Sequence, residues 1–211
     1  MILSFAHRFL FVAIPKTASQ AVRLALRPHL APGDWEQHML LGQKTIPVPQ
    51  IAALGHGHVS AAQIRPFIRA ERWPHLHKFA FVRDPVDRFL SYSWFIHRQS
   101  DLMQRDPLGT MKAMLSTPEW RAKIMLRPQH EFICDAGGEV MVDFVGRYER
   151  LQTDFASIGT RLNFPIGVLE SVNAGPRPVG EIPLDAELTA MLSEVYAADF
   201  RLFDYPVAGA A

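Results

Sequence analysis

An unbroken apolar run that ends in a basic turn constrains the fold of this chain most. The run covers residues 9–14 and is followed by Pro15, Lys16 and Thr17. Because apolar and polar residues do not alternate within it, the run is typical of a strand buried on both faces, as in a parallel sheet covered by helices. A helical pattern begins at Ser19, and the first N–H groups of a helix lack partners and favour negative charge. We therefore expect the turn to bind a phosphate or sulfate group.

The turn does not have the spacing of the common nucleoside-triphosphate loop. The pattern G-x-x-x-x-G-K-[ST] requires glycines, and the chain has none between Val12 and Lys16. An ordinary NTPase is therefore disfavoured. Taken alone, Pro-Lys-Thr is more often a surface turn with a solvated lysine, so a function can be inferred only with a second feature.

A second strand, turn and helix pattern places another basic residue at the end of an apolar run. The run covers residues 78–82 and meets Arg83. Asp84 is a good helix N-cap, and Pro85 is tolerated at the first helical position. We expect this helix to end near His97.

The residues alone leave two interpretations of Arg83 open. In the first, Arg83 and Ser91 bind one anion at the edge of the sheet. In the second, Arg83 pairs with Asp84 or Asp87, and Arg88 is solvated. The helical spacing places Arg88 and Ser91 away from the apolar face of the helix.

Together, the two basic turns resemble those of the sulfotransferases that use 3′-phosphoadenosine 5′-phosphosulfate (PAPS), in particular the branch that acts on carbohydrate chains. In that family a Pro-Lys-Thr loop holds the 5′-phosphosulfate, and an Arg-Asp-Pro segment with a later serine holds the 3′-phosphate. The resemblance implies two groups of donor-binding residues. They are Pro15, Lys16, Thr17, Ala18, Ser19 and Gln20 for the 5′-phosphosulfate, and Arg83 and Ser91 for the 3′-phosphate.

Two further motifs match the family in the same order. Residues 55–60 resemble the His-Gly-His segment of the uronyl 2-O-sulfotransferases, in which a histidine is the base for the acceptor hydroxyl, and residues 143–151 resemble the late strand and helix. The resemblance implies that His58 is the catalytic base, with His56 as the reserve candidate. A histidine suits this role because its ordinary pKa is near 6.5. Without the resemblance, a loop histidine that caps the nearby helix or bonds to backbone would be the better interpretation of His58. Lys16 is the candidate for stabilising the leaving phosphate.

The chain departs from the family pattern at some positions. Many relatives have two glycines after Pro-Lys-Thr, whereas this chain has Ala18 and Ser19, as the uronyl branch does, and Gln20 replaces a usual hydroxyl residue. Most donors of such a loop are backbone N–H groups, so its chemistry is retained. The residues that select an acceptor lie in variable segments, here 33–49 and 98–129, and a sugar chain is the first expectation.

A loop rich in glycine and proline lies near the end of the chain. It contains Asn173, Gly175 and Arg177. An arginine is suited to phosphate, so we expect Arg177 to belong to a loop that closes over the nucleotide.

Composition limits the class of partner and cofactor. The 22 basic and 21 acidic residues nearly cancel, so we expect no nucleic acid to bind. The single cysteine, Cys134, excludes an intrachain disulfide and a thiol zinc cluster, and the histidines lack a metal-binding spacing. We predict no metal. A length of 211 residues suits one domain, residues 1–211.

The order of the expected elements predicts an α/β fold. With residues 1–14 as the first strand, alternating strands and helices indicate a three-layer sandwich with a central, mainly parallel sheet. The resemblance makes this the P-loop NTPase-like sulfotransferase fold. No apolar stretch is long enough to span a membrane and no export signal is evident, so we expect a cytoplasmic protein. The sequence does not indicate which oligomeric state the protein adopts.

The leading functional hypothesis is transfer of a sulfuryl group from PAPS to a hydroxyl acceptor, with a glycan or small glycoconjugate as the first candidate. The product would be 3′-phosphoadenosine 5′-phosphate. Two alternatives stay open. A kinase-like phosphotransferase would require magnesium ligands and would prefer ATP, and a non-catalytic nucleotide-binding module would bind the nucleotide without turnover.

Overall fold

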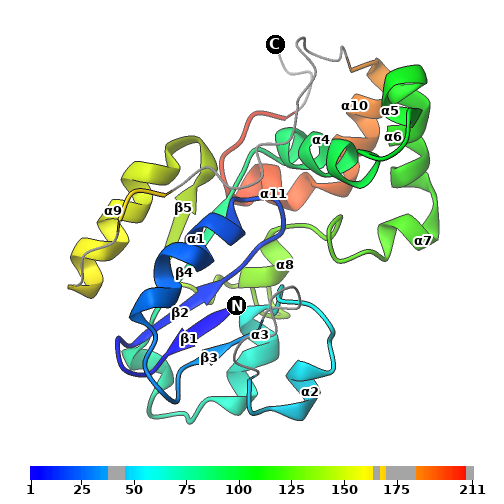
Figure 1. Ribbon diagram of the computed structural model, residues 1–211. Helices are drawn as coiled ribbons and strands as arrows, with labels where there is room; N and C mark the ends of the chain where they lie inside the picture. Colours follow the sequence, from blue (N-terminus) through cyan, green and yellow to red (C-terminus); the bar gives the residue numbers. More distant parts are fainter. Residues whose placement is uncertain (38–45, 164–166, 170–183, 208–211) are drawn as a thin grey trace. The chain divides into compact units, whose positions relative to one another are not determined.

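The chain forms two compact units in the computed structural model, which describes residues 1–37, 46–163, 167–169 and 184–207 (Figure 1). The first, which we call the sheet unit, consists of Met1–Val82 and Gln129–Val172. The second, the helical unit, consists of Arg83–Pro128 and Asn173–Ala211. The two basic turns predicted from the sequence therefore begin in different units.

The sheet unit contains a mixed sheet of five strands among the described residues. The strands lie in the order β3-β1-β2-β4-β5. The neighbours β2, β4 and β5 are parallel, as predicted, whereas β1 runs antiparallel to both β2 and β3. The strand bounds are β1 (Ile2–Ser4), β2 (Phe9–Val12), β3 (Trp35–Glu36), β4 (His77–Val82) and β5 (Phe144–Arg147).

Residues 1–14 form a hairpin, so the prediction of one strand there was wrong. Between β1 and β2 the chain turns, and Arg8 has a left-handed backbone with a φ of 54°. The Asp34 carboxylate holds the turn, because it accepts hydrogen bonds from Ser4 Oγ and the Phe5 N–H, both at 2.7 Å. The residue that stabilises the reversal thus lies far along the chain.

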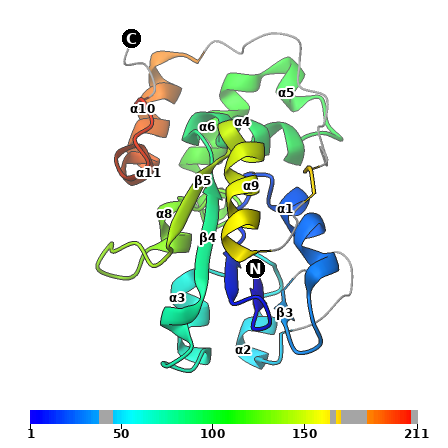
Figure 2. The same cartoon turned by 90° about the vertical axis from the view of Figure 1, so that its left-hand side faces the viewer.

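Apolar side chains bury both faces of the sheet. On one face, strand residues pack against α1 (Ser19–Leu26) and α9 (Leu151–Leu162). On the other side of β4 and β5, Figure 2 shows α3 (Ala61–Ile64) and α8 (His130–Ile133). The cluster under α1 and α9 consists of Ile2, Phe9, Phe11, Ala13, Val22, Leu26, Phe79, Phe81, Phe155 and Ile158. The sheet is therefore covered by helices on both faces.

Polar side chains cap helices in both units, and the cap at Asp84 is the one predicted from the sequence. Ser60 caps α3 in a capping box, in which its Oγ accepts from the Gln63 N–H at 3.2 Å and the Gln63 side chain accepts from the Ser60 N–H. Asp84 caps α4 (Pro85–Ile96) and accepts from the Asp87 N–H at 2.9 Å. The remaining short elements of the sheet unit are η1 (Arg27–His29), α2 (Pro49–Ala52), η2 (Arg65–Phe67), η3 (Trp73–His75) and η4 (Tyr148–Arg150).

The described part of the helical unit contains helices and no strand. Its last two helices meet at Tyr196, whose hydroxyl donates to the Leu126 carbonyl at 3.0 Å. Lys112 pairs with Asp185 at 2.6 Å and so joins the start of α10 to α6. Besides α4, the helices are α5 (Leu102–Arg105), α6 (Pro107–Ser116), α7 (Pro118–Arg121), α10 (Ala186–Val195) and α11 (Ala197–Leu202).

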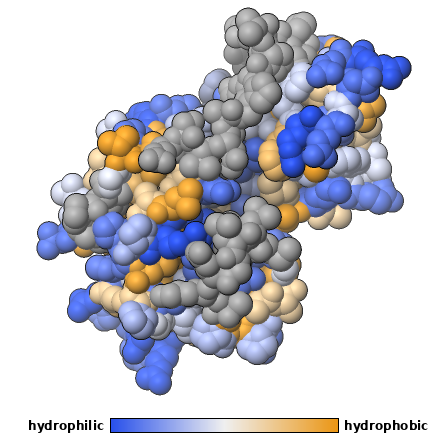
Figure 3. Space-filling model, in the orientation of Figure 1, coloured by the Kyte–Doolittle hydropathy of each residue, from blue (hydrophilic) through white to orange (hydrophobic). Residues whose placement is uncertain are grey.

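Polar and apolar residues are interspersed on one face of the protein. On the face visible in Figure 3, apolar residues lie scattered among polar ones. Within the described ranges, every helix is too short or too polar to cross a membrane.

Candidate active site

The turn after β2 has an uncommon backbone conformation. Lys16 and Ala18 have φ angles of 64° and 60°, in the left-handed region that non-glycine residues rarely adopt. Such a residue costs about 1 to 2 kcal/mol. Between them, Thr17 is buried, and its Oγ1 donates to the Ile14 carbonyl at 3.0 Å. The fold therefore holds this turn in a conformation that its side chains disfavour.

The same turn ends at the start of α1. Ala18 is the N-cap residue and provides no side-chain cap, and the Val22 N–H donates to its carbonyl at 3.2 Å. The first N–H groups of a helix have no intrahelical acceptor, and left-handed residues in a turn bring successive N–H groups to one side. Lys16 is partly exposed next to these groups. The arrangement can bind an anion through backbone donors and one side-chain charge.

His58 is held against the end of β2. Its Nδ1 lies 2.7 Å from the Ala13 carbonyl oxygen. A carbonyl oxygen can only accept, so Nδ1 carries the proton and Nε2 carries the lone pair. Burial, the main cause, lowers the pKa of His58 to about 3. The imidazole is therefore neutral near pH 7, in the tautomer that can accept a proton at Nε2.

His56 lies beside His58 on the same loop. The two ring centroids are 6.3 Å apart, and the ring planes are inclined by 35°. Both histidines belong to the sheet unit, as does the turn at Lys16. The structure thus brings the two candidate bases into one unit with the candidate anion loop.

Arg23 is a residue of this region that the sequence analysis missed. It lies on α1, only 2% of it is exposed, and its Nη2 donates to the Gly57 carbonyl at 2.6 Å. Burial is the main cause that lowers the pKa of Arg23 to about 10. The one sequence feature that could have indicated a buried role for Arg23 is its place beside Val22, which lies on the face of α1 that packs on the sheet. That position does not reveal which residue Arg23 contacts.

Arg83 and Ser91 lie in the helical unit, and each has a defined local setting. Arg83 follows Val82, the last residue of β4, and is buried. Its Nη2 lies 3.3 Å from Asp87 Oδ2, so the predicted pairing with Asp87 forms. Ser91 lies two turns into α4 and is partly exposed. Binding of an anion by Arg83 and Ser91 stays a prediction.

The prediction that Arg88 is solvated was wrong. Arg88 is 1% exposed and donates to the carbonyls of Met125 and Arg127, at 3.3 and 2.9 Å. Its guanidinium also lies over the ring of Tyr196, 5.2 Å from the centroid. Helical spacing alone could not reveal this, because a buried arginine depends on carbonyls from a distant segment.

Two further predictions concern the loop at Arg177 and the absence of a metal. Arg177 and Asn173 lie outside the described residues. In the part of the chain that is described, no group of three or more histidine, cysteine, aspartate or glutamate side chains is arranged to hold a metal ion.

Comparison with known proteins places nearly all of the chain in one family. No curated protein and no solved structure matches it. The model of the sulfotransferase family, however, matches residues 1–206, which include the turn at Lys16, the His58 loop and the segment at Arg83. A match of this extent leaves only the last few of the 211 residues outside it. The chain therefore belongs to the sulfotransferase family.

Proposed function

We propose that this protein transfers the sulfuryl group of PAPS to a hydroxyl acceptor. The acceptor oxygen forms a bond to sulfur, in line with the phosphoanhydride oxygen whose bond to sulfur breaks. The acceptor proton passes to a base, and 3′-phosphoadenosine 5′-phosphate leaves with the added negative charge. The observation that carries the proposal is the left-handed backbone of Lys16 and Ala18, which leads directly into the uncapped start of α1.

The turn fits the phosphosulfate end of the donor. Strained backbone of this kind persists where the surrounding structure enforces it, and it concentrates at ligand-binding sites. The positive end of the α1 dipole and the first N–H groups favour an anion at this position. These features support a P-loop-like role for one run of residues, namely Pro15, Lys16, Thr17, Ala18, Ser19 and Gln20.

Arg83 and Ser91 are proposed to bind the 3′-phosphate. A guanidinium presents five N–H donors, so the contact of Arg83 with Asp87 is compatible with a further, bidentate contact to a phosphate. Ser91 is exposed enough to donate its hydroxyl. Arg177 is proposed as a third phosphate ligand on the basis of its sequence context.

Lys16 is proposed to stabilise the leaving group. A fixed ammonium group directed at the bridging oxygen interacts more strongly with the transition state, in which charge develops, than with the bound donor. Its position between Pro15 and the start of α1 supports this role.

His58 is proposed to accept the proton of the acceptor hydroxyl. Its neutral imidazole, with the proton on Nδ1 held by Ala13, presents the lone pair of Nε2. A pKa of about 3 makes His58 a weak base in the absence of donor, and the negative charges of bound PAPS would raise the pKa toward the value a general base needs. His56 is the reserve candidate.

The acceptor is proposed to be a carbohydrate hydroxyl, and the transfer is proposed to need no metal. The support for the acceptor class is the likeness of residues 55–60 to the uronyl 2-O-sulfotransferases. The variable segments that would select the acceptor do not identify the sugar.

Binding of 3′-phosphoadenosine 5′-phosphate, measured by calorimetry, tests the donor site. We expect a micromolar dissociation constant, about −8 kcal/mol, that requires both the 3′-phosphate and Arg83. Adenosine 5′-phosphate and ATP serve as comparison ligands, and Arg83→Ala as the comparison protein. No binding, or a preference for ATP, would contradict the proposal and favour a phosphotransferase or a binding module.

A further inference from the structure

Arg23 lies where an arginine is uncommon. It is almost completely buried and lies next to Val22, whose side chain belongs to the core cluster under the sheet. A buried guanidinium needs hydrogen-bond partners for its donors. Those of Arg23 are backbone carbonyls. Nη2 donates to Gly57 at 2.6 Å, and Nη1 donates to Gln37 at 2.9 Å and to Met1 at 3.4 Å.

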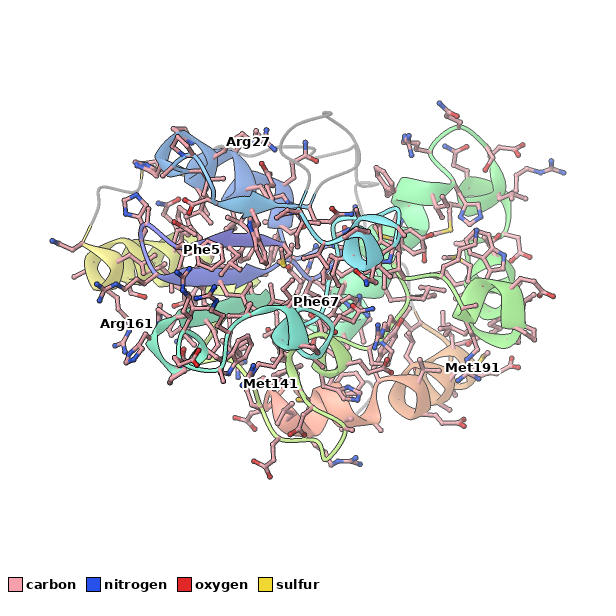
Figure 4. The ribbon with its side chains drawn as sticks, turned by 90° about the horizontal axis from the view of Figure 1, so that it is seen from below. Phe5, Arg27, Phe67, Met141, Arg161 and Met191 are labelled. Carbon is pink, nitrogen blue, oxygen red and sulfur yellow. The ribbon has the colours of Figure 1, made fainter. Side chains whose placement is uncertain are left out.

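The nearby carboxylate does not account for the position of Arg23. Glu36 is buried on β3, and both of its oxygens accept from Arg27, at 2.7 and 3.1 Å. Arg23 Nη1 lies farther from Glu36, at 3.8 Å. Arg27, labelled in Figure 4, lies on η1 directly after α1. Glu36 thus compensates the buried positive charge, whereas the short hydrogen bonds of Arg23 hold the backbone carbonyls of Gly57 and Gln37 in place.

The absence of a side chain at Gly57 makes the contact possible. A Cβ atom there would lie 2.7 Å from Arg23 Nη2 and 2.6 Å from the Gln37 carbonyl oxygen. Real Cβ atoms essentially never approach other atoms so closely. Glycine is therefore required at this position by space, and Arg23 and Gly57 fit each other.

The Arg23 contact helps to hold the backbone at the start of His58, together with the Met1 amino group, which donates to the same Gly57 carbonyl at 2.5 Å. Gly57 precedes His58, and the peptide between them is planar, so holding the Gly57 carbonyl also orients the His58 N–H and Cα. The imidazole is held separately by the Ala13 carbonyl, at 2.7 Å. His58 therefore has two anchors, one on its backbone and one on its side chain.

The two residues that hold His58, Ala13 and Arg23, lie on either side of the turn at Lys16. Ala13 is two residues before Pro15, and Arg23 is on the helix that begins directly after the turn at Lys16. We infer that Arg23 is a positioning residue, which fixes the His58 imidazole relative to the turn at Lys16. This inference rests on the proposed function for its catalytic consequence, and on the hydrogen bonds alone for its structural part.

The test compares Arg23→Met with Arg27→Met as a matched control. Each substitution removes one arginine near Glu36, but of the two arginines only Arg23 contacts the Gly57 carbonyl, which also accepts from the Met1 amino group in both variants. Arg23→Met leaves Glu36 paired with Arg27, so the buried carboxylate keeps its closest partner. Thermal unfolding identifies the conditions under which each variant is folded.

The first readout is the ¹⁵N spectrum of the His58 imidazole, which needs no activity. The wild type and Arg27→Met should show the proton on Nδ1, whereas Arg23→Met should show a mixture of tautomers and a pKa moved up toward 6.5. A folded Arg23→Met protein with the wild-type His58 signals would overturn the inference. Because this readout is independent of turnover, a failure of the proposed function would not be confused with it.

The second readout is turnover with a productive acceptor. Arg23→Met should lower kcat by about 10- to 100-fold, the effect of a displaced catalytic group, and leave the dissociation constant of 3′-phosphoadenosine 5′-phosphate unchanged. A loss of nucleotide affinity equal to the loss of kcat would assign Arg23 a purely structural role.

Gly57→Ala provides a second route if Arg23→Met does not fold. Its added Cβ would push the Gly57 carbonyl and the Arg23 guanidinium apart. The His58 signals should then change as in Arg23→Met. A folded Gly57→Ala protein with unchanged His58 signals and unchanged kcat would refute the positioning role.

Discussion

The Nδ1 atom of His58 lies 2.7 Å from the carbonyl oxygen of Ala13, a residue 45 positions earlier in the chain. This contact joins the histidine loop to the end of β2, just before the turn at Lys16. It also fixes the tautomer, since a carbonyl accepts only from a protonated nitrogen. The relationship gives the proposed base both a place and a protonation state.

Replacing His58 with alanine should abolish most turnover and leave donor binding intact. General base catalysis contributes about 10²- to 10⁴-fold, so kcat should fall by that factor, while calorimetry with 3′-phosphoadenosine 5′-phosphate should give the wild-type affinity. His56→Ala is the matched control and should retain turnover. If the two variants exchanged these behaviours, the role of base would belong to His56.

Replacing Lys16 with alanine should reduce the rate of sulfuryl transfer. Removing one group that stabilises developing negative charge typically costs about 10²- to 10³-fold in kcat. The measurement is acceptor-dependent release of 3′-phosphoadenosine 5′-phosphate. Lys112→Ala, which removes a lysine of the helical unit that pairs with Asp185 and Glu187, is the control and should keep its rate. Equal rates for wild type and Lys16→Ala would remove Lys16 from the mechanism.

Substitutions at Ala18 should reveal the strain in the turn. Ala18→Gly relieves the left-handed penalty of about 1 to 2 kcal/mol but loses about 0.4 to 1 kcal/mol through the freer unfolded chain. We expect the free energy of unfolding, measured in urea, to rise by about 0.5 to 1 kcal/mol. Ala18→Val should lower it, because a β-branched residue fits this backbone region poorly.

The control for Ala18 is the same substitution elsewhere on the helix. Ala25 lies on α1 and has no positive φ, so Ala25→Gly should destabilise the protein by about 1 kcal/mol. Opposite signs at the two positions would demonstrate the strain. A loss of stability at both would indicate that Ala18 is not strained in solution.

The stability of the protein should depend on pH through His58. Its pKa is about 3 in the folded chain and near 6.5 when unfolded. Between these values the unfolded state binds more protons, so the free energy of unfolding falls as pH falls below 6.5. The slope from one group is at most about 1.4 kcal/mol per pH unit. Well above pH 6.5, where the imidazole is neutral in both the folded and the unfolded state, the dependence from His58 vanishes.

Urea unfolding of wild type and His58→Gln at several pH values between 7 and 5 tests this dependence. The pKa of His77 is also lowered, mainly by burial, but both proteins retain His77, so the difference between them isolates His58. The two curves should diverge as the pH falls. Parallel curves would mean that His58 is not buried as a neutral imidazole.

The elements next to the site were predictable because their signals are local. Asp84 and Pro85 indicate the start of α4, where the Asp84 side chain accepts a hydrogen bond from a residue only three positions away. The end of the apolar run at Pro15 likewise marks the end of a strand. Each of these predictions needed only neighbouring residues.

The features that the sequence did not predict, namely the hairpin and the buried arginines, depend on partners that are far apart in sequence. The hairpin of β1 and β2 is held by Asp34, which lies 29 residues from Phe5. Arg23 bonds to Gly57, 34 residues away, and Arg88 to the carbonyl of Arg127, 39 residues away. Nearly any residue type supplies a backbone N–H or carbonyl, so these contacts leave no pattern in the sequence. The candidate bases were found through the family's motif, and the residue that anchors their loop was not.

The shortness of β3 affects how the sheet meets other molecules. This edge strand consists of Trp35 and Glu36 only, and the Glu36 carboxylate is turned inward to Arg27. Short edges and inward-pointing charges discourage a second chain from adding a strand. The Arg27–Glu36 ion pair thus also makes this edge of the described sheet a poor template for a strand from another chain.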